Sequence, residues 1–156
     1  MISIKFLGIL LVLIAGLSAS LWRIGYEKRK LEILDSWISL IAYIRNQIDC
    51  YLTPIHEILS QKEAPEIPLG TQEKTTLNAM LDASAPYLNA EEHRLLGGFV
   101  REIGSHYREE QIKQCNYYLN SLRPLRDARA TELPARLRVT LALSLCSSLG
   151  ISILLW

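Results

Sequence analysis

Histidines are the residues of this chain whose chemistry is most easily judged from spacing, because metal sites and catalytic bases depend on it. The sequence contains three of them, His56, His93 and His106. The last two are 13 residues apart with a turn predicted at Gly104, and Glu92 or Glu102 could complete a metal site with them. No ligand spacing such as HxxxH supports that site, so we predict solvated surface histidines and no bound metal.

Motifs for hydrolysis or phosphate binding are also missing from the sequence, which contains no GxxxxGK[ST], GxGxxG, HExxH or GxSxG pattern. Gly97-Gly98 lies inside a predicted helix, where a glycine pair favours close helix packing over phosphate binding. Ser105 and His106 are adjacent, which is not how a nucleophile and its base are brought together. We therefore predict a protein that is not an enzyme, with no catalytic residue, no cofactor and no small-molecule substrate.

The cysteines do not form a redox or disulfide pattern. Cys50, Cys115 and Cys146 make no CxxC motif, and their number is odd. Such usage is typical of a reducing compartment, so it favours a cytoplasmic location for most of the chain.

Two long apolar runs at the ends of the chain determine the predicted organisation. Phe6–Trp22 has 17 residues without a charge, and Val139–Trp156 has 18. Thirty-two of the 33 charged residues lie in Arg23–Arg138. Runs of this length cover about 26 Å of a hydrocarbon core about 30 Å thick, so each is slightly short for a membrane helix. We predict a transmembrane helix at 1–22, a cytoplasmic helical bundle at 23–138 and a transmembrane helix at 139–156.

Basic residues border both apolar runs on their inner sides. Four basic residues stand against Glu27 between Arg23 and Lys30, and five arginines occupy 123–138. Positive charge beside membrane segments stays in the cytoplasm, so both clusters predict a multi-pass cell-membrane protein with its central domain inside. The apolar run explains the second cluster without nucleic acid, which we do not expect as a partner. A cleaved signal peptide is the alternative interpretation of the first run and would place the domain outside the cell.

The central domain shows helical periodicity and no alternation typical of strands. Apolar residues recur in steps of three and four between Leu34 and Leu52, and Thr53-Pro54 then predicts a break, with Thr53 as cap and Pro54 as helix start. Residues 61–71 hold two prolines and a glycine and predict a loop. We predict an all-α fold, a small antiparallel helical bundle flanked by N- and C-terminal transmembrane helices.

The second half of the domain carries clearer helix signals. A helix is predicted over 72–83, and Asn89 opens another with the capping-box pattern, closed by Gly104 as its C′ residue. The last helix begins near Tyr107. Pro124 and Pro134 lie in it, and we expect a bend or break there because proline removes a helical hydrogen bond.

Several short motifs in a fixed order resemble the stage III sporulation protein AB family of endospore-forming bacteria. They are Tyr51-Leu52-Thr53-Pro54-Ile55, Leu88-Asn89-Ala90-Glu91, Glu102-Ile103-Gly104, Arg108-Glu109-Glu110-Gln111-Ile112 and the terminal Leu149–Leu155. The likeness covers nearly the whole chain, although each motif is short. The prolines at 124 and 134 depart from the family, whose last helix is typically charged and without proline.

The resemblance implies a helical domain similar to that of the type II secretion inner-membrane platform protein. It implies a non-enzymatic membrane platform subunit of a sporulation-associated, secretion-like channel complex, in the mother-cell membrane facing the forespore. The expected partners are other subunits of that complex, including a secretion-type ATPase, and the membrane. The alternative is a membrane-tethered or exported helical regulatory or sensor module with other partners.

Two groups of residues are predicted to matter for structure or for partner binding. Thr53, Pro54 and Gly104 match motif positions and have structural roles in the helix assignments above. We expect partner binding at Arg108, Glu109, Gln111 and Tyr118.

Overall fold

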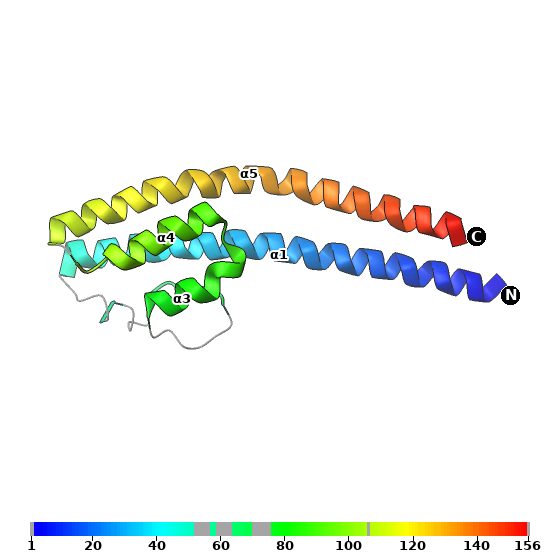
Figure 1. Cartoon of the computed structure of the whole chain (residues 1–156), viewed down its shortest axis with the longest axis horizontal. Coiled ribbons are helices and arrows are strands. Elements are labelled where there is room, and N and C mark those ends of the chain that lie inside the picture. The colour runs from blue at the N-terminus through cyan, green and yellow to red at the C-terminus, as the bar shows by residue number, and fades with distance from the viewer. Residues whose placement is uncertain (1, 52–56, 59–63, 70–75, 106, 156) are drawn as a thin grey trace. The chain divides into compact units, whose positions relative to one another are not determined.

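The chain is helical in every element that the computed structural model describes (Figure 1). The elements are α1 (Ile2–Tyr51), α3 (Leu77–Ser84), the 3-10 helix η1 (Ala85–Tyr87), α4 (Ala90–Glu102) and α5 (Arg108–Leu155). The predicted all-α class is confirmed, since no strand occurs among these residues.

The structure describes the backbone of all residues except 1, 52–56, 59–63, 70–75, 106 and 156. Side chains are also left undescribed at 2–13, 17, 51, 152, 154 and 155. Thr53 and Pro54, the predicted cap and helix start, therefore lie outside the described residues.

We expected a bend or a break at Pro124 and Pro134; helix α5 runs through both prolines, so the break is wrong and the bend stays a prediction. Both proline rings are exposed to solvent. A proline inside a helix frees the carbonyl four residues earlier, and water can bond that carbonyl when the site faces outward. The missing hydrogen bond therefore costs less here than it would in a packed interior.

The chain divides into two compact units, which we name the bundle and the terminal unit. The bundle is Arg29–Arg129, and the terminal unit consists of Met1–Lys28 with Ala130–Trp156. Helices α1 and α5 each contribute one part to both units.

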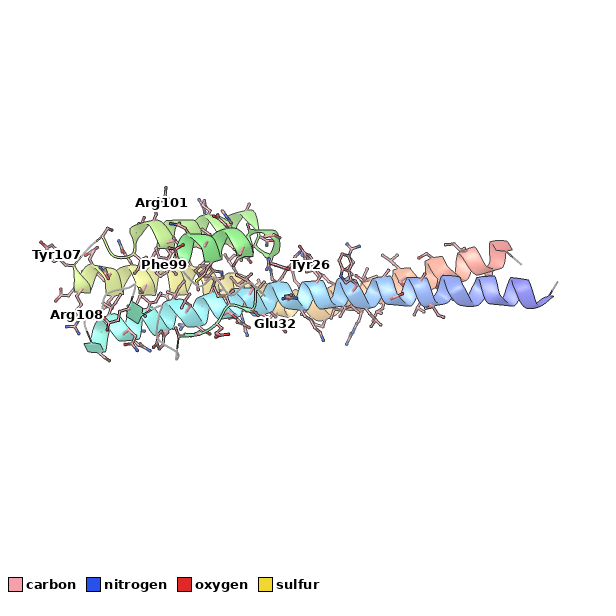
Figure 2. All side chains as sticks on the ribbon, turned by 90° about the horizontal axis from the view of Figure 1, so that it is seen from below. Tyr26, Glu32, Phe99, Arg101, Tyr107 and Arg108 are labelled. Carbon is pink, nitrogen blue, oxygen red and sulfur yellow. The ribbon has the colours of Figure 1, made fainter. Side chains whose placement is uncertain are left out.

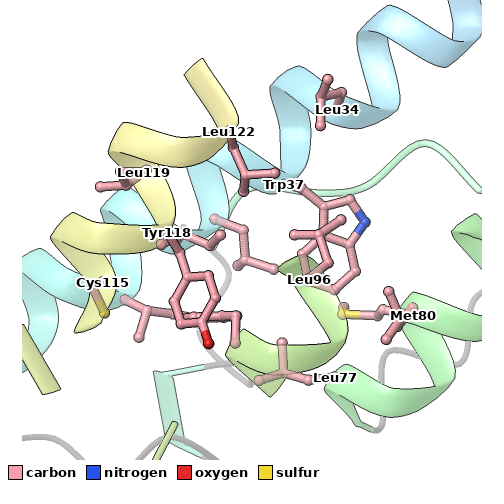
Figure 3. Close-up of a cluster of buried hydrophobic side chains, with 14 of the residues drawn as sticks. Leu34, Trp37, Leu77, Met80, Leu96, Cys115, Tyr118, Leu119 and Leu122 are labelled. Atoms are coloured by element: carbon pink, nitrogen blue, oxygen red, sulfur yellow. The ribbon is translucent and has the colours of Figure 1, made fainter. Parts of the chain in front are cut away.

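Large apolar side chains fill the bundle (Figure 3). Helix α1 contributes a stripe at helical spacing, from Ile33 and Trp37 to Ile44 and Ile48. Helices α3, α4 and α5 cover it with the remaining core residues: Leu77, Met80, Leu81, Leu96, Phe99, Cys115, Tyr118, Leu119 and Leu122. Trp37 is fully buried, and its indole N–H donates to Ser84 Oγ at 2.9 Å, so its one polar group is satisfied.

The glycine pair of α4 lets two neighbouring helices approach. A Cβ built at Gly97 would lie 3.7 Å from Leu81 of α3, and one at Gly98 would lie 2.8 Å from the Tyr118 hydroxyl of α5. The second distance is shorter than any ordinary contact. A side chain at position 98 would clash with Tyr118, so glycine there lets the tyrosine pack in this position.

Buried and half-buried ion pairs tie α5 to the other bundle helices. Arg129 Nη2 lies 2.9 Å from Glu92 Oε2, and these side chains are 14% and 2% exposed. Glu92 also accepts the Asn89 N–H at 2.8 Å, which forms part of the predicted capping box at the start of α4. Arg126 bonds both carboxylate oxygens of Asp35 on α1, at 2.7 and 3.2 Å. Arginines that the sequence analysis assigned to a membrane border thus hold the bundle together.

Small polar residues line the contact within the terminal unit. Ser144 Oγ donates to the Gly16 carbonyl at 3.1 Å, and a Cβ at Gly16 would lie 3.5 Å from Ser148 Cβ. Ser20 and Ser148 are 4% and 6% exposed. Residues this small let two helix backbones approach closely.

The predicted membrane location is contradicted. Within the part of the chain that is described, no helix is long and apolar enough to cross a membrane. In the second run, Thr140, Ser144, Ser147 and Ser148 interrupt the described apolar side chains, and Arg138 precedes them. The prediction of a multi-pass protein with membrane helices at 1–22 and 139–156 is therefore wrong.

Candidate partner-docking surface

The start of α5 is held in place by the turn that precedes it. Helix α4 ends at Glu102, and Gly104 follows with φ 88°, the left-handed conformation that a glycine C′ residue adopts readily. Ser105 Oγ donates to the Glu102 carbonyl at 2.6 Å. Glu109 and Glu110 lie in the first turn of α5, where negative charge interacts favourably with the helix N-terminus.

Arg108 connects the first turn of α5 to the last turn of α1. Its guanidinium lies 3.0 Å from an Asp49 carboxylate oxygen and also donates to the Asp49 carbonyl. That carbonyl is among the last four of α1, which lack partners within the helix. Both side chains are about half exposed, at 47% and 52%, so the pair positions the helices more than it stabilises them.

Two exposed tyrosines lie near the start of α5, Tyr107 directly before it and Tyr117 within it. Tyr107 is 94% exposed and Tyr117 is 62% exposed. They are the only exposed large apolar side chains among the described residues of the bundle. Figure 2 shows Tyr107 beside Arg108 at the start of the helix. Between the tyrosines, exposed Glu110 and Lys113 form a weak pair at 3.9 Å. We name Tyr107, Glu109, Glu110, Lys113 and Tyr117 the α5 surface.

Tyr118, the residue after Tyr117 in α5, is buried, with 6% exposure. Its ring packs edge-on against the rings of Phe99 and Tyr117, with 5.7 and 5.2 Å between the ring centroids. Its hydroxyl donates to Glu102 Oε2 at 2.8 Å. Burial, and after it the Glu102 carboxylate, raises the pKa of Tyr118 to about 12, because both disfavour the phenolate. Because the Tyr118 ring touches that of Tyr117, it helps to hold Tyr117 in place.

The other predicted site residues are distributed between surface and interior. Glu109 is exposed on the first turn of α5, and Gln111 is half-buried with its N–H bonded to the Tyr107 carbonyl at 3.0 Å. Arg108, Glu109 and Gln111 therefore lie together, whereas Tyr118 is inside the bundle. The prediction of partner binding at these four residues stays a prediction.

Catalytic and metal chemistry has no visible centre in the described part of the chain. No group of three His, Cys, Asp or Glu side chains there could hold a metal ion. Glu92, a predicted partner of His93 in such a site, instead pairs with Arg129. His93 is exposed, and His106 lies outside the described residues.

Known proteins offer no further guide. No protein-family model, no curated protein and no solved structure matches the chain. The sporulation-family resemblance is therefore neither supported nor opposed by them.

Neither Tyr107 nor Tyr117 was predicted as a site residue. One signal was present, because Tyr107 lies directly after a predicted turn and before two acidic residues that start a helix. Asp49 could not have been found, since only the fold brings it to Arg108 from 59 residues away.

Proposed function

We propose that this protein is a non-enzymatic platform subunit of a sporulation-associated, secretion-like complex. It docks other subunits of that complex, including a secretion-type ATPase, through its helical bundle. The family resemblance of the ordered motifs supports the choice of complex. The all-helical bundle with an exposed aromatic surface supports docking as its task.

The observation that carries the proposal is the exposure of Tyr107 and Tyr117, at 94% and 62%. Tyrosine is enriched at protein interfaces because it presents a large apolar ring with a polar tip at a low cost in conformational entropy. A bundle that buries its other large apolar side chains gains nothing for its own stability from these two. Their exposure is explained by a partner that covers them.

The surrounding charges give the α5 surface its specificity. Glu109, Glu110 and Lys113 form a polar rim around the tyrosines, as charged residues do around the centre of a typical interface. Arg108 holds the surface in register with α1, so it acts by positioning. Tyr118 supports Tyr117 from inside the bundle in the same way.

A binding titration with a purified secretion-type ATPase from the same organism tests the proposal. We expect the double variant Tyr107→Ala/Tyr117→Ala to bind about tenfold more weakly or worse, as loss of an aromatic anchor predicts. The matched control is His93→Ala, an exposed residue on α4 that should leave binding unchanged.

Two outcomes would overturn the proposal. One is binding that the tyrosine variant does not weaken, or no binding at all by the unchanged chain. The other is a gene neighbourhood without a secretion-type ATPase or other genes of a sporulation channel, which would remove the basis for the family assignment.

A further inference from the structure

The second half of α5 carries a line of exposed residues without charge, at the spacing of a coiled coil. Steps of four, three, four and three residues separate its members, which are Val139, Leu143, Cys146, Gly150 and Ile153. All five are exposed, and the three large side chains among them are more than half accessible to solvent. Alternating steps of three and four keep residues on one side of a helix, and two helices can pair along such a line. We name these five residues the outward stripe.

The outward stripe faces away from the contact within the terminal unit. Ser144 and Ser148 are the residues of this part of α5 that meet Gly16 of α1. Each residue of an α-helix advances by about 100° around the helix axis. Cys146, two positions from both serines, therefore lies on the opposite side of the helix. The other helix of the terminal unit leaves the stripe open to a second molecule.

Nothing in the described part of the chain accounts for Gly150. No atom there lies within 4 Å of the position that a Cβ would take, and the backbone at this point is ordinary α-helix. A glycine inside a helix costs about 0.5–1 kcal/mol relative to alanine, and glycine is used where another part of a protein approaches the backbone closely. A second chain that packs at this point explains the glycine.

The order of large and small residues makes the stripe complementary to a copy of itself that runs in the opposite direction. Leu143 lies three residues before Cys146, and Gly150 lies four residues after it. When two stripes cross at Cys146, each leucine meets the space that the other chain's glycine leaves open. Val139 then meets Ile153, since each is seven residues from the centre. A contact between identical chains requires such symmetry, whereas an unrelated partner does not.

Charge favours the same direction. The stripe has no charge, and Arg136 and Arg138 lie just before it. In a parallel pair, these arginines of the two copies would lie side by side and repel each other. In an antiparallel pair centred on Cys146, the two copies of Arg138 are about 24 Å apart along the helix axis, at about 1.5 Å per residue. This separation exceeds the Debye length of about 8 Å, so their repulsion is screened.

We propose that two copies of this chain pair antiparallel through the outward stripe, with Cys146 of each copy beside that of the other. The pair removes from water the leucine, isoleucine and valine side chains that the fold leaves exposed, which favours association. The stripe belongs to the terminal unit and the α5 surface to the bundle, so this inference does not rest on the proposed docking function. Tyr107→Ala/Tyr117→Ala should dimerise like the unchanged chain.

Thiol crosslinking of the purified chain tests the pairing. The probe is a short bis-maleimide, which joins two cysteines that lie close together. Cys50→Ser keeps the exposed Cys146, and we expect this variant to form a covalent dimer. The matched control is Cys146→Ser, which keeps the exposed Cys50 and should stay monomeric. Equal dimer fractions in the two variants, or no dimer in either, would overturn the inference.

A mixing experiment tests the direction of the pair. Val139→Cys and Ile153→Cys are each made in a chain that carries Cys50→Ser and Cys146→Ser. They are crosslinked separately and then as a mixture. An antiparallel pair predicts a covalent dimer mainly in the mixture. Dimers that form as readily within each separate sample would contradict the proposed arrangement.

Two leucines of equal exposure provide the energetic test. Leu143 in the stripe and Leu21 on α1 are both 66% exposed. Leu143→Glu places a carboxylate in the contact and should weaken dimerisation at least tenfold in sedimentation equilibrium, whereas Leu21→Glu should leave it unchanged. Equal weakening would overturn the inference, because it would mean that association depends on general hydrophobicity. So would a chain that is monomeric at every concentration and whose Cys146 is shielded from maleimide only by lipid vesicles or only by the ATPase.

Discussion

The bundle and the terminal unit are both made of regular helices, but different side chains lie between the helices within each unit. In the bundle, the core holds Trp37, Phe99 and Tyr118 among leucines and isoleucines. In the terminal unit, the described contact joins Gly16 to Ser144 and Ser148, and Ser20 is buried. Of the twelve exposed large apolar side chains that are described, ten belong to the terminal unit and two to the bundle.

The difference shows that helix length and apolar content do not determine where packing energy resides. A buried aromatic or aliphatic side chain contributes about 1.5–3 kcal/mol by leaving water, whereas a serine or glycine removes little apolar surface. The bundle therefore fills its own interior. Among its described residues, the terminal unit brings small side chains together and exposes ten large apolar ones. The following variants test this contrast, from the largest expected effect to the smallest.

Removing an aromatic residue from the core of the bundle should have the largest effect on stability. Phe99→Ala leaves a cavity beside Tyr118 and should lower the free energy of unfolding by about 3–5 kcal/mol. Urea denaturation followed by circular dichroism measures the loss. Tyr107→Ala, at a 94% exposed site, is the control and should change stability by less than about 0.5 kcal/mol. Similar losses in both variants would contradict the assignment of the core.

The two units also differ in their ion pairs. Arg129→Met leaves Glu92, 2% exposed, without its cation and should cost about 3 kcal/mol. Arg136→Met breaks the exposed i,i+4 pair with Glu132 in the terminal unit and should cost about 0.3–0.5 kcal/mol. Thermal unfolding of both proteins under identical conditions gives the comparison. A cost for Arg136→Met that equals that of Arg129→Met would contradict the distinction between a shielded and a hydrated pair.

Alkaline pH should destabilise the bundle through Tyr118. The pKa of this hydroxyl is raised from 10.0 to about 12 in the folded chain, so the folded state holds the proton more tightly than the unfolded state. The resulting stability is fully present below pH 10.0 and is lost as the pH rises to about 12. The loss amounts to about 3 kcal/mol. Urea denaturation across this window should show it in the unchanged chain. Tyr118→Phe should decline less steeply, and an identical decline would refute the assignment.

Glycines should respond to a methyl group in opposite ways in the two units. Gly98→Ala forces a Cβ to within 2.8 Å of the Tyr118 hydroxyl and should cost about 1–2 kcal/mol. Gly25→Ala, where nothing lies within 4 Å, should stabilise its helix by about 0.5–1 kcal/mol. The double variant Gly98→Ala/Tyr118→Phe tests the cause, because removing the hydroxyl relieves the clash. Non-additive free energies of unfolding would show this coupling, and strict additivity would exclude it.

The smallest effect belongs to the terminal unit. Ser144→Ala removes the 3.1 Å bond to the Gly16 carbonyl and should cost about 0.5–1 kcal/mol. Hydrogen exchange of the amides around residue 16 measures it, since they should exchange faster when the contact loosens. Ser147→Ala is the control, because Ser147 bonds only carbonyls of its own helix. Equal exchange in the two variants would assign the contact no energetic role.

Local signals in the sequence predicted the local structure of the chain well. The capping box at Asn89 and the glycine at 104 place α4 at Ala90–Glu102, because capping chemistry depends on neighbours within a few residues. The predicted helix at 72–83 is found as Leu77–Ser84 over the described residues. The prolines misled the prediction because their cost depends on solvent exposure, which no local pattern reveals.

Long-range features could not be read in the same way. The pairs Arg108–Asp49, Arg126–Asp35 and Arg129–Glu92 join residues 37 or more positions apart in the chain. Arg126 and Arg129 looked like part of the border of an apolar run, because charge near such a run has the same appearance in either role.

The burial of Trp37 gives the bundle an optical reporter of its own. Its indole is fully enclosed and bonded to Ser84, whereas Trp22 in the terminal unit is 79% exposed. An indole in an apolar interior emits at shorter wavelengths than one in water. Unfolding of the bundle will therefore shift the Trp37 emission to the red, while Trp22 emits at long wavelength from the start. Replacing both Trp22 and Trp156 with phenylalanine would leave Trp37 as the one tryptophan of the sequence, so the shift of the emission would follow the core.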